Sequence, residues 1–258
     1  MTAALLRRCG LAALLLSPAE AQAAGDAQHL HYVAYSTGLR VIDVVADFDL
    51  GQQAYSVTLS VHTIGLFGAV VHGATESSVH GRWTGPAPFP ATYDSHGLWR
   101  GEQLHVAISY AGGQPTVATL LPADTGEREA VPVALWANTI DNLSAMAALL
   151  RDVATTGRCD GRRRVFDGRR LSEIAAVTAG TEVLPETDRS VFHGPALRCD
   201  FTGTLLAGFK YEDNRARAAR PQHGAAWFAP LRPGGPPLPV RVRFATPFFG
   251  DAILYLAP

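Results

Sequence analysis

The chain has 258 residues, of which 47% are hydrophobic and 17% charged, and its formal net charge at pH 7 is −1. A nearly neutral chain has no overall electrostatic attraction for nucleic acid or for an anionic membrane surface, so we expect no nucleic-acid partner. Beyond the first 24 residues no stretch approaches the ~18 consecutive apolar residues of a spanning helix, so we expect no transmembrane segment there.

Residues 1–24 have the order of features that is typical of a cleavable secretory signal peptide. Arg7 and Arg8 supply positive charge, residues 11–16 form a short apolar run, and small residues follow. We therefore predict export to the periplasm and a mature chain, 25–258, that forms a single β-rich domain. The choice between Sec and twin-arginine export stays open.

Alternation of apolar and polar residues is the strongest pattern in the rest of the chain. It occurs at residues 40–50, 55–61, 103–110 and 240–244. A period of two predicts antiparallel strands with one buried and one wet face. In the first strand, Asp43, Asp47 and Asp49 occupy the wet face.

Residues 142–156 break this pattern with helical spacing. The apolar positions are Leu143, Met146, Ala147, Leu150 and Val153. Asp141 or Asn142 can cap the start of this helix, and Gly157 can end it. Because a single amphipathic helix must bury its apolar stripe, we expect a mainly β fold with one strongly curved, open antiparallel half-barrel or spiral sheet that wraps this central helix.

Two cysteines flank the segment after the helix. Cys9 leaves with the signal peptide, so the mature chain keeps Cys159 and Cys199. In an oxidising compartment we expect a disulfide between them that fixes the helix exit against the strand at 190–198. A reactive redox pair is the alternative, but the CxxC spacing of oxidoreductases is missing.

Residues 162–174 are predicted to form a hairpin in which Asp167 and Gly168 make a type I′ turn. Arginines crowd this hairpin: Arg162, Arg163, Arg164, Arg169 and Arg170, preceded by Arg158. Guanidinium groups suit phosphates and carboxylates, so the cluster is a candidate patch for an anion or an envelope protein. The alternative is a solvated hairpin whose charges prevent edge-to-edge pairing.

The sequence contains no nucleophile elbow, zinc-binding helix or phosphate-binding glycine loop. His29 and His31 share a strand face, but two imidazoles are an incomplete metal site. We interpret the three aspartates of the first strand as its solvent-exposed face, and the alternative interpretation is a calcium site. We therefore predict a protein that is not an enzyme and has no cofactor and no metal.

A gap between the sheet and the helix is a candidate site for an acyl chain. Leu66, Phe67, Met146 and Leu150 are the residues that we expect to line it. The first functional hypothesis is therefore an apolar ligand, either a lipid or a lipidated partner. The alternative is a structural envelope protein that binds a protein partner through the arginine hairpin at 158–170.

Ordered landmarks run through the mature chain. They are Tyr32, Tyr35, Gly38-Leu39, Tyr55, Thr63-Ile64-Gly65, Pro90-Ala91-Thr92-Tyr93, Thr139 to Ser144, Cys159, Phe166-Asp167-Gly168-Arg169-Arg170, Cys199, Gly208-Phe209 and Leu238-Pro239-Val240-Arg241. Their order and spacing resemble the domain-of-unknown-function 3108 family of exported bacterial proteins. Asn142 departs from the resemblance, since proline is expected there, but both residues suit a helix start. The resemblance implies an open β half-barrel around a helix, similar in outline to periplasmic lipoprotein carriers, and no catalytic residues.

Overall fold

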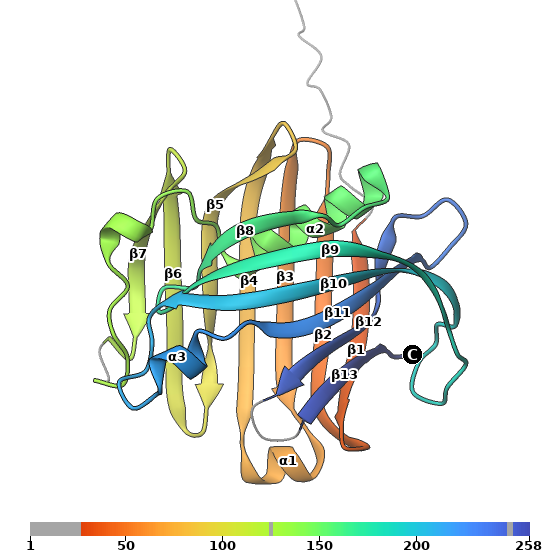
Figure 1. Ribbon diagram of the computed structural model, residues 1–258, viewed down its shortest axis with the longest axis horizontal. Coiled ribbons are helices and arrows are strands. Elements are labelled where there is room, and N and C mark those ends of the chain that lie inside the picture. Colours follow the sequence, from red (N-terminus) through yellow and green to blue (C-terminus); the bar gives the residue numbers. More distant parts are fainter. Residues whose placement is uncertain (1–26, 124–125, 247–249) are drawn as a thin grey trace, which may run out of the picture.

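The computed structural model describes residues 27–123, 126–246 and 250–258 (Figure 1). The predicted signal peptide, 1–24, lies outside the described residues. The strands are β1 (Gln28–Ser36), β2 (Leu39–Leu50), β3 (Ala54–Thr63), β4 (Gly73–Thr84), β5 (Ala87–Trp99), β6 (Glu102–Ala111), β7 (Gln114–Leu121), β8 (Gly161–Phe166), β9 (Leu171–Leu184), β10 (Gly194–Ala207), β11 (Gln222–Pro230), β12 (Pro237–Thr246) and β13 (Gly250–Leu256). The helices are α1 (Gly65–Val70), α2 (Asn142–Thr156) and α3 (Arg215–Ala218), with the 3-10 turn η1 (Val133–Leu135).

All of these strands belong to one antiparallel sheet. Its order is β7-β6-β5-β4-β3-β2-β1-β13-β12-β11-β10-β9-β8, so the first and last strands of the chain are neighbours at its centre. Tyr32 of β1 pairs with Leu256 of β13 in that central ladder. The two ends of the order, β7 and β8, are the sheet's open edges. The prediction of a mainly β chain with one open antiparallel sheet is confirmed.

The sheet curls so that its two halves face each other. In Figure 1 the strands β8 to β12 run across the front of β2 to β6, and α2 lies between the two groups. Helix α2 contacts β2, β3, β4, β5, β8 and β12. Its buried side chains are Leu143, Ser144, Ala145, Ala147, Ala148, Leu150 and Val153.

The helix begins and ends for local reasons. The Asp141 side chain accepts a hydrogen bond from the Ser144 backbone N–H, which satisfies one of the free donors of the first turn. Gly157 follows the last turn with a φ of 66°, a left-handed conformation that glycine adopts without a Cβ penalty.

The predicted alternation is confirmed in β2. Val44, Ala46 and Phe48 are buried, whereas Asp47 is exposed. Among the described residues, no helix is long and apolar enough to cross a membrane.

Two local predictions need correction. The hairpin between β8 and β9 forms, but only Gly168 has a positive φ, and a type I′ turn requires it at both central residues. The Asp167 carboxylate instead accepts from the backbone N–H groups of Arg169 and Arg170, which holds a longer loop. Cys199 lies within β10 and does not end the strand, because the ladder with β9 and β11 continues past it.

Candidate functional site

An apolar pocket of about 270 Å³ lies beside the C-terminal half of α2. Its apolar wall is formed by Phe48, Leu50, Leu150, Ala154, Pro237 and Leu238. These residues come from the end of β2, one side of α2 and the start of β12. The volume lies just below the usual range for small-molecule pockets, about 300–1,000 Å³, so the space suits one narrow apolar group.

The local sequence explains why this pocket stays open. Leu150 and Ala154 are one helical turn apart and therefore share a side of α2. Ala154 is small, so it leaves space where a larger side chain would fill the wall. Pro236 and Pro237 also line the pocket, and their rings restrict the backbone there. The pocket is thus bounded by rigid elements and one short side chain.

Arg151 is the charged residue of the pocket lining. Its Cζ atom lies 4.3 Å from the centroid of the Trp83 ring, in a cation–π contact. Its Nη1 atom is buried and has no hydrogen-bond partner among the described residues. The pocket therefore combines an apolar wall with a guanidinium group whose hydrogen-bonding capacity is incompletely used.

The four residues expected to line a common gap do not come together. Leu150 lines the pocket, and Met146 is partly buried against the core. Leu66 and Phe67 lie on α1, which packs on β2 and β3, and Leu66 is 75% exposed. The expectation fails for these two because the chain leaves the strand pattern at Gly65, whose φ of 63° starts a short helix beyond the end of β3.

A second polar cluster is buried at the opposite end of α2. The Asp141 carboxylate, fully buried, accepts hydrogen bonds from the Ser144 N–H at 2.7 Å and the Ser144 hydroxyl at 2.6 Å. Because that hydroxyl proton points at Asp141, the Tyr55 hydroxyl donates to Ser144 Oγ at 2.8 Å. Burial raises the pKa of Asp141, although the hydrogen bonds from Ser144 oppose the shift. These hydrogen bonds all lie at the first turn of α2, so we assign the cluster a structural role.

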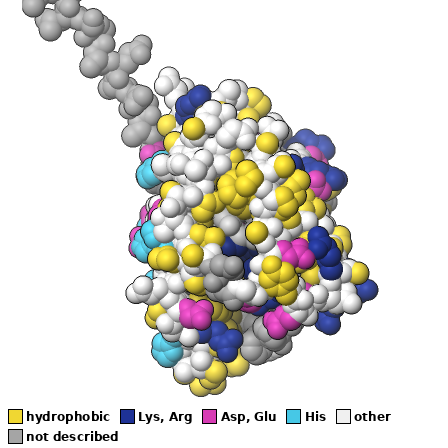
Figure 2. Space-filling view, turned by 90° about the vertical axis from the view of Figure 1, so that its left-hand side faces the viewer, with side chains coloured by type: hydrophobic (Ala, Val, Ile, Leu, Met, Phe, Trp, Pro, Cys, Tyr) yellow, Lys and Arg dark blue, Asp and Glu magenta, His cyan; other side chains and the backbone are white. Residues whose placement is uncertain are grey.

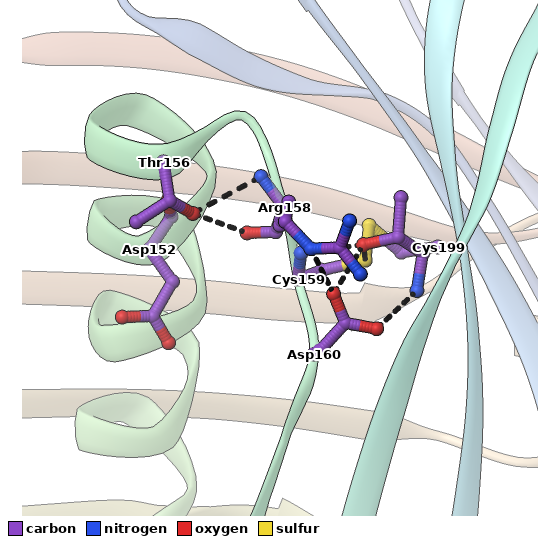
Figure 3. Close-up of polar contacts among 7 residues, drawn as sticks. Asp152, Thr156, Arg158, Cys159, Asp160 and Cys199 are labelled. Carbon is purple, nitrogen blue, oxygen red and sulfur yellow. Dashed lines mark hydrogen bonds and ion pairs between the residues drawn. A yellow bond between two sulfur atoms is a disulfide. The ribbon is translucent and has the colours of Figure 1, made fainter.

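The two cysteines have the geometry of a disulfide (Figure 3). The bond between their sulfur atoms joins the segment after α2 to β10, and their Cα atoms are 6.1 Å apart. Beside them, Asp160 accepts from the backbone N–H and the hydroxyl of Thr178 and from Arg158 Nε. Cys159 and Cys199 are both buried, which fits a structural link better than a reactive thiol pair.

Arginines of β8 line a second groove, of about 550 Å³, at the open edge of the sheet. Each of the three already has a partner within the chain. The pairs are Arg162 with Glu173 at 2.9 Å, Arg163 with Asp152 at 2.6 Å, and Arg164 with the Leu135 carbonyl at 3.0 Å. Residues 86–88 and Asn138 complete the groove. The groove is basic, but its guanidinium groups are partly neutralised.

The remaining two arginines lie at the tip of the hairpin and do not extend that groove. Arg169 donates to the Pro122 carbonyl at 2.6 Å, and Arg170 pairs with Asp167 at 2.7 Å. The predicted five-residue patch is therefore divided between the edge of β8 and the loop after it.

Histidines gather on the outer face of the first half of the sheet, at His29, His31, His62, His80, His96 and His105. Figure 2 shows histidine and acidic side chains along the left margin of that view. His29 and His31 bond to Asp47 and Asp43, at 2.6 and 2.9 Å. No group of three or more potential metal-ligating side chains occurs within the ranges that the structure describes.

Sequence reasoning missed two parts of the pocket. The end of the proline-rich stretch at 230–239 supplies part of the pocket lining, which its composition does not indicate. Arg151 could have been noticed in the sequence, because it lies eight residues after Leu143 and four after Ala147 and so shares their side of the helix. A charged residue on the buried stripe of a helix is unusual and indicates a special environment.

The described chain is thus a mainly β protein with one curled antiparallel sheet, a helix packed on it, and a small apolar pocket at that helix. The family model described as "Protein of unknown function (DUF3108)" matches residues 30–257, so the chain belongs to this family. A comparison with curated proteins found no significant match.

One solved structure is similar to this chain: the crystal structure of a β-barrel-like protein of the domain of unknown function DUF1849 from Brucella abortus. The match has 10% sequence identity and a TM-score of 0.48, and it covers 89% of this chain and 96% of the other.

Proposed function

We propose that the chain is a non-catalytic periplasmic protein of the cell envelope that binds one apolar ligand, the alkyl chain of a lipid or of a lipidated partner. The pocket at Leu150 and Ala154 carries the proposal, because it is an apolar recess between rigid elements. The signal-like pattern of residues 1–24 supports an envelope location.

In this proposal the curved sheet is a half-barrel whose concave face holds α2. The pocket is the part of that face which the helix leaves unfilled.

The size of the pocket limits the ligand. A volume of about 270 Å³ lies just below the usual range for small-molecule pockets, so we expect it to hold part of one chain and not the two chains of a phospholipid. Each buried methylene contributes about 0.8 kcal/mol, before the costs of association are subtracted. We therefore expect reversible binding of a single chain.

The test is the uptake of a fluorescent fatty acid by the mature chain and by two tryptophan variants. Ala154→Trp fills the pocket and should abolish uptake. Ala69→Trp is the matched control, because Ala69 is an exposed alanine on α1, away from the pocket. Wild-type protein that takes up no probe, or an Ala154→Trp variant that binds as well as the control, would refute the proposal.

The groove at β8 supports a second candidate, a docking site for an acidic segment of an envelope protein. The observation that supports this candidate is the run of three arginines on an open sheet edge. We rank it second because Arg162 and Arg163 already pair with carboxylates of the same chain. Arg163→Glu together with Arg164→Glu should abolish binding of an acidic peptide, whereas unchanged affinity would exclude this site.

A further inference from the structure

We infer that the pocket ligand is a single-chain amphiphile with an anionic head, a carboxylate or a phosphate, which Arg151 binds. This inference rests on the proposed function, since it names the chemical class of the ligand for the same pocket. The apolar wall would hold the chain, and the guanidinium group would hold the head.

The first argument is the state of the Arg151 charge. Within the described ranges, none of the carboxylates forms an ion pair with it, and its Nη1 atom is buried without a hydrogen-bond partner. Its sequence neighbour Asp152 pairs with Arg163 at 2.6 Å and is therefore occupied. Burying part of an unpaired cation is costly. The pocket lining therefore contains a positive charge that no described carboxylate balances.

The second argument is the geometry of the contact with Trp83. A guanidinium group stacks on an aromatic ring through its planar face, and its N–H donors lie in that plane. Arg151 Cζ lies over the Trp83 ring, 4.3 Å from its centroid, so the ring contact helps to position the cation. Such a pre-positioned fork matches the paired oxygens of a carboxylate or a phosphate.

The third argument is the proximity of the charge to the apolar wall. Arg151 lines the same pocket as Leu150, Ala154 and Pro237. A ligand that lies against these residues therefore has one end within reach of the guanidinium group. A neutral alkyl chain would leave this cation without a counter-ion, whereas an anionic head would pair with it through the accessible part of the half-buried side chain that lines the pocket.

Calorimetric titration of the mature chain tests the inference with four probes below their micelle-forming concentrations: dodecanoate, dodecyl phosphate, dodecanol and inorganic phosphate. We expect at least one of the two anionic amphiphiles to bind about tenfold or more tightly than dodecanol, as a charge-assisted hydrogen bond predicts. Comparing the affinities of dodecanoate and dodecyl phosphate shows whether the preferred head group is a carboxylate or a phosphate. Inorganic phosphate should bind far more weakly than either, because it has no chain for the wall.

Two substitutions assign the preference to Arg151. Arg151→Met keeps the length of the side chain without its charge, and it should remove the preference for the anion while dodecanol still binds. Arg158→Met is the matched control, because Arg158 is an exposed arginine just after α2 that pairs with Asp160. It should behave as wild type.

The outcomes separate the inference from the proposed function. If dodecanol binds wild type as tightly as both anions, or if Arg151→Met keeps the preference, the inference is wrong although the pocket binds chains. Inorganic phosphate that matches dodecyl phosphate would also overturn it, in favour of a simple anion site. If none of the three amphiphiles binds, the proposed function itself fails. Should Arg151→Met not fold, the four-probe comparison on wild type decides, and binding of dodecanol as tight as that of both anions would overturn the inference.

Discussion

Replacing Asp141 tests how the start of α2 is held against the sheet. Asp141→Ala removes an acceptor from the Ser144 N–H and from the Ser144 hydroxyl, both of which are buried. Asp141→Asn keeps both contacts if the chain of hydrogen bonds reverses, because the amide then donates to Ser144 Oγ and that hydroxyl donates to Tyr55. Both variants are uncharged, so comparing them isolates the hydrogen bonds from the cost of burying a carboxylate.

The expected difference follows from two losses. A missing N-cap costs about 1 kcal/mol, and a buried donor left without a partner costs about 1–3 kcal/mol. Asp141→Ala should therefore unfold with a free energy about 2–4 kcal/mol below that of Asp141→Asn. Urea denaturation followed by tryptophan fluorescence at pH 7 measures it. A difference below about 0.5 kcal/mol would refute the reasoning.

The same residue predicts a pH dependence. Burial raises the pKa of Asp141 above its unfolded value of about 3.9, so the native state binds this proton more tightly. The resulting stabilisation is fully present below about pH 3.9 and is lost as the pH rises through the native pKa. Wild type should therefore lose stability relative to Asp141→Asn as the pH rises from about 4. A gap that is constant, or that widens in favour of wild type, would contradict this sign.

Three further predictions concern the frame around the pocket. Cys159→Ser together with Cys199→Ser should lower the free energy of unfolding, measured in urea, by about 4 kcal/mol, because the disulfide closes a loop of 40 residues. A loss under about 1 kcal/mol would contradict this prediction. Gly208→Ala should lower the melting temperature more than Gly203→Ala, because a Cβ at Gly208 would clash with the Arg169 carbonyl oxygen, whereas a Cβ at Gly203 meets open space. Equal melting temperatures would be evidence against it. Arg163→Gln should cost about 1–3 kcal/mol, since its half-buried carboxylate partner on α2 is left unpaired, and a neutral effect would refute a role for this pair.

Much of the fold follows from local pattern. The alternation in β2 predicts which side of the strand is buried, because a strand with one wet face needs a period of two. The helix bounds follow from Asp141 and Gly157, whose capping roles are local chemistry. The resemblance to the family is confirmed by the match over residues 30–257.

The site could be predicted only in part. The pocket joins β2, α2 and the start of β12, where Leu50, Leu150 and Leu238 are separated by 100 and 88 residues. Periodicity carries no information on such distant contacts. Leu66 and Phe67 were assigned to the gap from apolarity alone, although a run of apolar residues after a strand can equally form an exposed turn of helix. The arginine hairpin failed as a single patch because the intramolecular partners of its side chains cannot be deduced from spacing.

Native mass spectrometry of the mature chain, purified from a periplasmic extract without detergent, tests most directly whether the pocket holds an alkyl chain. The account predicts one single-chain lipid per molecule in wild type and in Ala69→Trp, and none in Ala154→Trp. Wild-type protein that carries no adduct, and gains none when dodecanoate is added, would contradict the account.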